Sequence, residues 1–292
     1  MGNLNNNLAG FLYLAAFVAF FGFPAVSKAT AAEAFRVATF NIHYITDPDG
    51  LPKWEARRDA VTAVMNTMNA DIVGFQEMET FSGGKFNPVN RQREWILQTV
   101  GGYQVAAVGD PAIFPSTQPV FYRMDRFELV SQGWFFYSPT PDVIYSRSFD
   151  GGFDYYTVTV RLRERLSGRT LTVFNVHTDI RSTGNRQKAI AMITGRARKL
   201  VDSGEPVLVL GDFNAMWFGS NMKAMEAIGL SGTRLSRPTY HFGIGAGLTP
   251  AIDHILHGPG LQRVGEATVH KTRFKGAYPS DHYPISALYQ FE

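Results

Sequence analysis

Six short polar clusters interrupt an otherwise apolar sequence, and four of them directly follow apolar, strand-like runs. The four are Thr39-Phe40-Asn41-Ile42-His43, Gly74-Phe75-Gln76-Glu77, Asn175-Val176-His177-Thr178-Asp179 and Gly211-Asp212-Phe213-Asn214, and the other two are Ile252-Asp253-His254-Ile255 and Ser280-Asp281-His282-Tyr283-Pro284. Each cluster alone has an ordinary explanation, because carboxylates after strands are usually solvated, cap helices or form turns. Ligand sites in layered α/β proteins form where strand ends meet. The six clusters together therefore predict one shared site.

The composition limits the chemistry that such a site can perform. The chain of 292 residues has no cysteine, which excludes disulfide frameworks, cysteine nucleophiles, thiolate zinc sites and iron–sulfur clusters. Catalysis must therefore use carboxylates, imidazoles, amides, hydroxyls, or a metal ion held by oxygen and nitrogen. With 45% hydrophobic and 18% charged residues the chain can bury a full core, and its formal net charge of +3 is no nucleic-acid signature.

The first 32 residues differ from the rest of the chain. Residues 8–26 are almost wholly apolar, and the small residues Ala29-Thr30-Ala31-Ala32 follow them. This order is typical of a secretory signal peptide, although residues 1–7 carry no Lys or Arg. The apolar run also approaches the ~20 residues of a membrane-spanning helix. We therefore expect a secreted or periplasmic protein whose residues 1–32 are a signal peptide, or alternatively a protein anchored in a membrane by residues 8–26.

Residues 33–292 alternate between strand and helix patterns without repeats or a polar linker. Alternating or continuous apolar runs predict strands, and apolar residues at helical spacing predict helices. The predicted strands are 35–40, 71–75, 104–108, 119–122, 127–136, 155–162, 170–177, 207–210, 252–256, 262–269 and 283–288, and the predicted helices are 54–69, 91–100, 185–201 and 221–228. This mixture of buried strands, hairpins and helices indicates a single domain with two packed sheets and outer helices.

The polar clusters resemble the motifs of the endonuclease/exonuclease/phosphatase superfamily, the DNase-I-like metal-dependent phosphoesterases. The matching segments, in the family's order, are TFNI (39–42), QE (76–77), NVHTD (175–179), GDFN (211–214), IDHI (252–255) and SDHYPI (280–285). The segment FYRMDRFELVSQGWFF (121–136) resembles the bacterial branch of metal-dependent hydrolases. The resemblance implies an α+β or α/β fold, a four-layer α/β/β/α sandwich of two mixed sheets with the active site at one edge.

The resemblance also implies a hydrolase of phosphate esters that uses Mg²⁺ or Mn²⁺. Glu77, with Asn41 and Asp281, would supply the hard oxygen ligands that these ions prefer.

In the same interpretation Asp212 would orient or deprotonate the attacking water, and Asn214 would fix the phosphate or the Asp212 carboxylate. His282, held by Asp253, would contact the phosphate, and His177 would donate a second hydrogen bond to a phosphoryl oxygen.

Four further residues are candidates for substrate contact: His43, Arg147, Tyr155 and His241. Tyr155 is expected where many relatives carry an Arg that touches the phosphate, and a phenol donates one hydrogen bond without a positive charge. Either Arg147 or His43 would compensate for that charge, or the substrate would need less neutralisation. His241 lies in a segment, Thr239-Tyr240-His241-Phe242, that is similar to a loop of the same bacterial branch.

The remaining histidines are expected to be structural. His254 should point away from Asp253 and pack between the sheets or face solvent, and His257 and His270 should lie at the surface.

Three interpretations of the function are open from the sequence. The first is an exported nuclease, the second is the same chemistry on a lipid or small-molecule phosphate ester, and the third is a membrane-tethered binding module without activity. The complete set of acidic and histidine residues favours an enzyme, which we expect to be monomeric. Nucleic-acid binding would require cations on the surrounding loops. The candidates are Arg91, Arg93, Arg147, Arg181, Arg186 and Lys275.

Overall fold

The computed structural model describes residue 1 and residues 33–45, 53–78, 88–247 and 249–292. The predicted signal peptide or anchor lies outside these described residues. None of the helices in the described ranges combines the length and the apolar composition that crossing a bilayer requires.

Two six-stranded mixed sheets form the framework of the described residues. The first sheet has the order β11-β12-β1-β2-β4-β3, and the second has the order β5-β6-β7-β8-β10-β9. The strands of the first sheet are β1 (Phe35–Asn41), β2 (Ile72–Gln76), β3 (Tyr103–Ala106), β4 (Val120–Arg123), β11 (Leu261–Val269) and β12 (Ile285–Phe291). Those of the second are β5 (Phe127–Phe136), β6 (Tyr156–Glu164), β7 (Thr170–His177), β8 (Val207–Asp212), β9 (Ser231–Gly232) and β10 (Asp253–His257). The pairs β1–β2 and β7–β8 are parallel, so their carboxyl ends reach the same edge.

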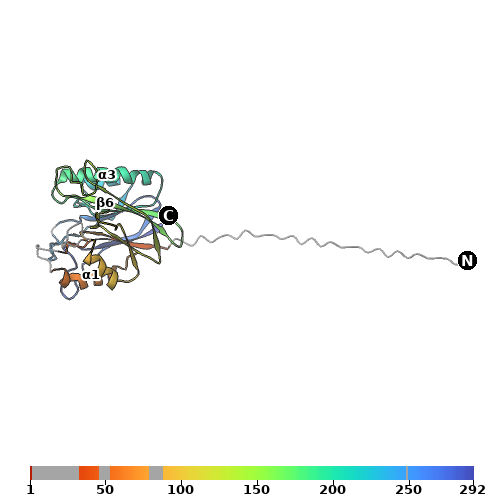
Figure 1. Cartoon of the computed structure of the whole chain (residues 1–292), viewed down its shortest axis with the longest axis horizontal. Helices are drawn as coiled ribbons and strands as arrows, with labels where there is room; N and C mark the ends of the chain where they lie inside the picture. Colours follow the sequence, from red (N-terminus) through yellow and green to blue (C-terminus); the bar gives the residue numbers. More distant parts are fainter. Residues whose placement is uncertain (2–32, 46–52, 79–87, 248) are drawn as a thin grey trace. The chain divides into compact units, whose positions relative to one another are not determined.

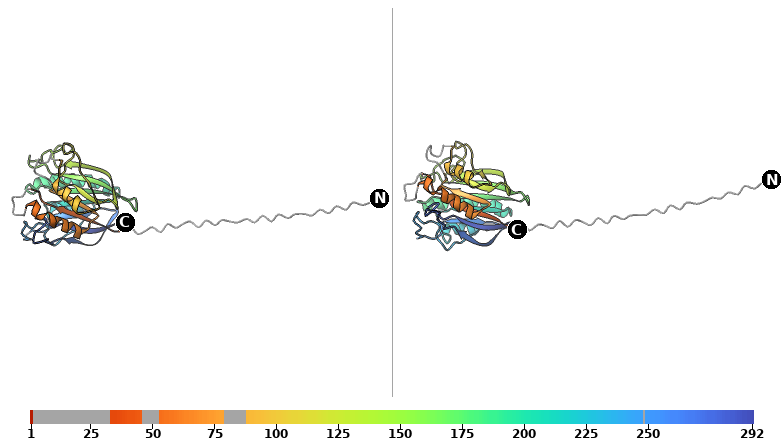
Figure 2. Two further views of the ribbon diagram at one scale, coloured as in Figure 1. Left: turned by 60° about the horizontal axis from the view of Figure 1, so that its bottom comes forward. Right: turned by 90° about the horizontal axis from the view of Figure 1, so that it is seen from below.

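Helices cover the outer face of each sheet (Figure 1). The helices α1 (Trp54–Met68) and α2 (Arg91–Thr99) lie over the first sheet, as the view from below in Figure 2 shows. The helices α3 (Thr183–Asp202) and α4 (Ser220–Glu226) lie over the second sheet. The result is the expected four-layer α/β/β/α sandwich, and the predicted fold is confirmed.

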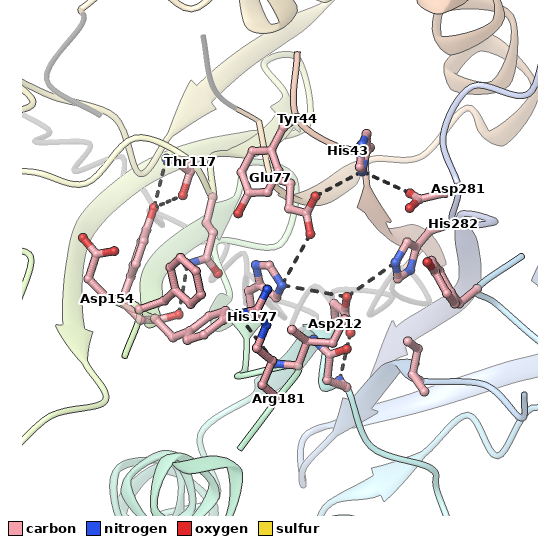
Figure 3. A pocket seen from close by; sticks show the side chains of 18 of the residues that line it. His43, Tyr44, Glu77, Thr117, Asp154, His177, Arg181, Asp212, Asp281 and His282 are labelled. Atoms are coloured by element: carbon pink, nitrogen blue, oxygen red, sulfur yellow. Dashed lines mark hydrogen bonds and ion pairs between the residues drawn. The ribbon is translucent and has the colours of Figure 1, made fainter. Parts of the chain in front are cut away.

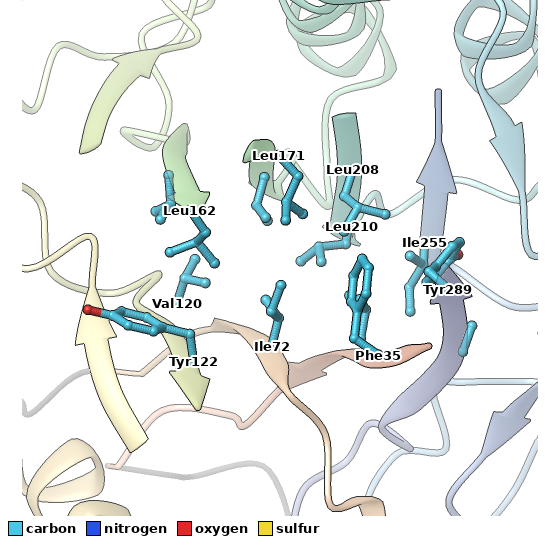
Figure 4. Close-up of a cluster of buried hydrophobic side chains, with 14 of the residues drawn as sticks. Phe35, Ile72, Val120, Tyr122, Leu162, Leu171, Leu208, Leu210, Ile255 and Tyr289 are labelled. Atoms are coloured by element: carbon cyan, nitrogen blue, oxygen red, sulfur yellow. The ribbon is translucent and has the colours of Figure 1, made fainter. Parts of the chain in front are cut away.

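The central core lies between the two sheets (Figure 4). Leu162, Leu171, Leu208 and Leu210 of the second sheet face Phe35, Ile72, Val120 and Tyr122 of the first. In β1 the side chains of Phe35 and Val37 enter this core, whereas Ala38 and Phe40 pack under α1. Both faces of such a strand are apolar, which explains the continuous apolar runs in the sequence.

Most predicted elements are present within a few residues of their predicted ends. The strand predicted at 104–108 stops at Ala106, because Ala107 adopts a left-handed backbone (φ 58°) and donates its N–H to the Gln132 side chain. The helix predicted from Asn185 begins at Thr183, because the Ser182 hydroxyl caps it by accepting the Asn185 N–H. Strand β9, with two residues, was not predicted.

Two glycines let the framework close at the edge where the polar clusters meet. Gly211 precedes Asp212 in β8 with φ 141°, and a Cβ there would lie 1.9 Å from the Val176 carbonyl oxygen. A Cβ on Gly74 of β2 would lie 2.2 Å from a Leu210 methyl carbon of the opposite sheet. Glycine at these positions therefore sets the distance between β7 and β8 and between the two sheets.

We expect Gly211→Ala to destabilise the protein by about 3 kcal/mol, because the added methyl group collides with backbone that cannot move away cheaply. Gly195→Ala is the matched control, since a Cβ there meets nothing within 4 Å on helix α3. The control should gain about 0.5–1 kcal/mol from reduced backbone entropy. Urea unfolding of both variants measures the difference, and equal stabilities would refute the steric account.

Candidate active site

The polar clusters converge at one edge of the paired sheets, as predicted. Asp212 at the end of β8 is in register with His177 at the end of β7 and with Asp253 at the start of β10. Facing them from the first sheet are residues that follow β1 and β2 and precede β12. Together they line a pocket of about 390 Å³ (Figure 3). The predicted residues that line it are His43, Glu77, Tyr155, His177, Asp212, Asn214, Asp281 and His282.

His282 and Asp253 form a buried ion pair behind the pocket wall. The Nδ1 of His282 donates to Asp253 Oδ2 at 2.9 Å, and its Nε2 lies 3.7 Å from Asp212 Oδ2. Burial alone would lower the pKa of His282, but the Asp253 carboxylate, and then Asp212 and Asp281, raise that pKa well above its usual value. His282 is therefore an imidazolium at neutral pH, with Nε2 turned toward the pocket.

Asp212 is a buried carboxylate with several partners. It accepts hydrogen bonds from the Asn214 N–H at 2.8 Å and from Asn41 Nδ2 at 3.1 Å. Burial, and then the charge of Asp253, raises the pKa of Asp212 to about 6, although His282 and His177 oppose the rise. A carboxylate with this pKa can accept a proton near neutral pH.

Across the pocket from Asp212 and His282, at the same end, lie Glu77, His43 and Asp281. The Nδ1 of His43 lies 3.4 Å from Glu77 Oε2 and 3.4 Å from Asp281 Oδ1 (Figure 3). Burial would raise the pKa of Glu77, but the His43 hydrogen bond and the charge of His177 outweigh it and lower the pKa to about 2. Burial lowers the pKa of His43, while Glu77 and Asp281 raise it, with a net rise. Glu77 is therefore ionised at any working pH.

The donor set around Glu77 fits a divalent cation. Two carboxylate oxygens, from Glu77 and Asp281, converge on the position of one ring nitrogen of His43. Mg²⁺ is usually bound through one or two carboxylates, with water and substrate phosphate completing the shell. Asn41 Nδ2 donates to Glu77 at 3.0 Å and its Oδ1 accepts the His43 N–H, so in this structure Asn41 positions Glu77. Its role as a metal ligand stays a prediction.

A second acidic cluster is less suited to a metal ion. The ligand atoms of Asp212, Asp253 and His282 lie within 4.8 Å of one another. A histidine must be unprotonated to bind a metal, whereas the carboxylates of Asp253 and Asp212 raise the pKa of His282 and favour its protonated form. This cluster is better suited to holding and moving protons.

Three site residues adopt the left-handed backbone conformation that is rare for residues other than glycine. They are His43 (φ 63°), Glu77 (φ 58°) and Asn214 (φ 45°), and each follows the end of a strand. The sharp turn sends each side chain back across the strand ends. Local strain of this kind persists where the surrounding packing over-determines the conformation, and it is common at active sites.

Two predicted substrate contacts lie outside the pocket. His241 is fully buried behind the site, and its ring stacks on Tyr283 at 4.0 Å between centroids. Arg147 is exposed and donates to the Gly151 carbonyl at 3.2 Å. Neither residue lines the pocket. His241 was expected there from a resemblance to a family loop and Arg147 from the need for a positive charge, and neither argument encodes the direction of a loop side chain.

The other histidines also differ from expectation. His254 is buried on the helix-facing side of β10, against Phe213, and its Nε2 contacts the Ala215 carbonyl oxygen at 2.8 Å. It therefore points away from Asp253 as predicted, but packs under the helix layer. His257 and His270 are half-buried, so they reach the surface only in part.

Further residues line the pocket beside the predicted site residues. Among the proposed loop cations, Arg181 lines the pocket, whereas Arg91 pairs with Glu55 and Arg186 donates to the Asp179 carbonyl. Arg181 is the one guanidinium among the described lining residues. Further lining residues without a sequence signal are Tyr44, Ser116, Thr117, Gln118, Phe153, Asp154 and Tyr240.

Arg57 of α1 fixes the loops that carry His43 and Asp281. Its side chain is fully buried and donates to four main-chain carbonyls at 2.6–2.9 Å. The acceptors are Ile42, His43, Tyr44 and Pro279. One guanidinium thus joins the segment after β1 to the segment before β12.

Comparisons with known proteins agree with this geometry. The sequence profile described as the Endonuclease/Exonuclease/phosphatase family matches residues 38–282. An uncharacterized protein, L388, of Acanthamoeba polyphaga mimivirus is 27% identical over 166 residues, which cover 56% of this chain and 59% of that protein. The chain thus matches about three fifths of this relative's length.

Two solved structures from Bacteroides thetaiotaomicron share the fold. One is an endonuclease/exonuclease/phosphatase family protein, 21% identical with a TM-score of 0.77, and the match covers 89% of this chain and 99% of that one. The other is the mannosyl-6-phosphatase Bt3783, 22% identical with a TM-score of 0.74, and the match covers 88% of this chain and 100% of that one.

We expect Arg57→Met to lower the free energy of unfolding by roughly 3 kcal/mol, because four buried carbonyls lose their donor. Arg58→Met on the same helix is the control, since Arg58 is half-exposed over Trp95 and should cost under about 1 kcal/mol. Urea unfolding measures both values. Similar losses in the two variants would show that Arg57 does not hold the loops.

His241 should make stability depend on pH. Burial, and then the charge of His282, lowers its pKa from 6.5 to about 4. As the pH falls, His241 takes up a proton in the unfolded chain before it does so in the folded protein. The stabilisation that the neutral ring gives the folded protein is therefore complete above pH 6.5 and is lost as the pH falls toward 4. At pH 5 the loss is about 2 kcal/mol. His241→Phe should remove this loss. Urea unfolding midpoints of both proteins over a pH series test this, and the same dependence of the midpoint on pH in both would contradict the prediction.

Proposed function

The chain belongs to the endonuclease/exonuclease/phosphatase family, and on that premise we propose that it is a divalent-metal-dependent phosphoesterase. The observation that carries the proposal is the pairing of Asp212, a buried carboxylate with a raised pKa, with the His282 imidazolium across one pocket. A proton acceptor and a fixed positive charge in one small cavity are the two groups that hydrolysis of a phosphate ester needs from side chains.

The reaction adds water to phosphorus. The water oxygen bonds to phosphorus, the bond from phosphorus to the ester oxygen breaks, and the alcohol leaves with its oxygen. Asp212 takes the proton of the water, and Asn214, whose N–H binds Asp212 at 2.8 Å, keeps that carboxylate in place. A proton from the site or from solvent completes the alcohol.

Two imidazoles face the phosphoryl oxygens in this proposal. His282 supplies a positive charge that Asp253 orients through Nδ1. His177, whose Nε2 lies 3.7 Å from Glu77 and 3.9 Å from Asp212, donates a second hydrogen bond. Mg²⁺ or Mn²⁺ held by Glu77 and Asp281 would neutralise charge on the phosphoryl group and on the leaving oxygen. Tyr155, edge-on to His177 at 5.3 Å between centroids, closes this end of the pocket.

Two substrate classes are consistent with the family: nucleic acid, and small or lipid phosphate esters. The similarity to a mannosyl-6-phosphatase supports the second class, and the family description includes both. Export to the periplasm or beyond is part of the proposal and rests on the sequence of residues 8–32.

Asp212→Asn and His282→Ala should each lower kcat at least a hundred-fold, because each removes a group used in the transition state. The assay is a panel of plasmid DNA, p-nitrophenyl phosphate and hexose phosphates with Mg²⁺, with Mn²⁺ or with excess EDTA. Asp142→Asn is the control, since Asp142 is exposed and outside the pocket. Full turnover in excess EDTA, or full activity of both site variants, would refute the proposal.

A further inference from the structure

The active-site pocket has a second end that the hydrolytic residues do not use. Figure 3 shows Thr117 and Asp154 on one side of the pocket, well separated from Asp281 and His282 on the other. The lining residues of the loops that contain them are Ser116, Thr117, Gln118, Tyr145, Phe153, Asp154 and Tyr155. Because the phosphate must lie near Asp212, this second end is available to the rest of the substrate.

We propose that this second end binds the alcohol part of the substrate, and that this alcohol is small, uncharged and rich in hydroxyl groups. The inference rests on the proposed phosphoesterase activity. The substrate class is then the phosphate ester of a sugar or similar polyol.

Polar groups at this end match hydroxyls. Asp154 supplies a carboxylate, which can accept hydrogen bonds from two hydroxyls. The Thr117 hydroxyl lies 2.6 Å from the hydroxyl of Tyr156, and either can donate. Gln118 is 1% exposed and donates to the Tyr156 carbonyl at 3.0 Å, which fixes this wall of the pocket.

An aromatic surface adjoins these polar groups. Phe153 lines the pocket although the residue is 58% exposed, so its ring is open to a ligand. Its ring packs edge-on to Tyr155 at 6.2 Å between centroids, and the Arg181 guanidinium lies 5.6 Å from its centre. A polyol ring offers C–H groups to such a surface and hydroxyls at its rim. Phe153 and Asp154 are neighbours in sequence, so one turn supplies both kinds of contact.

The charge of the pocket disfavours a nucleic-acid strand. The imidazoles of the described lining residues, His43, His177 and His282, belong to the end that takes the scissile phosphate, and Arg181 is the one Lys or Arg side chain among those lining residues. A strand carries further phosphates beside the scissile one, and each needs a cation from the protein. The volume of about 390 Å³ is within the range of small-molecule pockets.

The test compares variants on two kinds of ester. The polyol substrates are glucose 6-phosphate, mannose 6-phosphate and glycerol 3-phosphate, and the reference is p-nitrophenyl phosphate, which has no hydroxyl groups for Asp154 to bind. We expect Asp154→Asn and Phe153→Ala to lower kcat/KM about ten-fold more for the preferred polyol phosphate than for p-nitrophenyl phosphate, mainly through KM. Asp142→Asn and Val143→Ala, exposed residues of the same loop, are the matched controls.

The outcomes separate this proposal from the proposed function. If the wild-type protein with Mg²⁺ or Mn²⁺ hydrolyses none of these esters and no DNA, the phosphoesterase proposal fails. If it hydrolyses p-nitrophenyl phosphate but the variants affect all esters equally, the polyol site is wrong while the chemistry stands. If an oligonucleotide has the highest kcat/KM and its KM rises steeply with salt, the substrate is nucleic acid, and the polyol proposal is overturned.

Discussion

The burial of four carboxylates at one edge of two packed sheets is the constraint on which the rest of the site depends. The side chains of Glu77, Asp212, Asp253 and Asp281 are at most 15% exposed. Buried charges must be paired or bind a metal ion, because their desolvation costs more than the packing returns. Imidazoles supply the pairing: His43 bridges Glu77 and Asp281, and His282 lies between Asp253 and Asp212.

This pairing divides the pocket into two chemical environments. On one wall Glu77 keeps its charge, since its neighbours lower its pKa to about 2, and a cation of high charge density can bind there. On the other wall Asp253 and burial raise the pKa of Asp212 to about 6. Neighbouring carboxylates with opposite pKa shifts are the pattern of a site that holds a charge with one and moves a proton with the other.

The backbone holds these groups at fixed distances. Gly211 lets β7 and β8 approach immediately before Asp212, and Arg57 ties the loop after β1 to the loop before β12. Left-handed turns at His43, Glu77 and Asn214 aim three side chains into one pocket. The strain of these turns is tolerated because sheet packing on both faces leaves the strand ends no alternative position.

The sequence alone determined the two sheets, their outer helices and the polar clusters at the strand ends. Burial of a strand or helix face imposes an apolar periodicity on neighbouring residues, so the local sequence shows it directly. Motifs that resemble a known family also predicted that Asp212, Asp253 and His282 share one site. The tertiary structure alone decided that Arg57 binds four distant carbonyls, that Asp154 and Gln118 share a pocket with Glu77, and that His241 is buried. These relations join loops far apart in the chain, and the direction of a loop side chain depends on packing that no local pattern records.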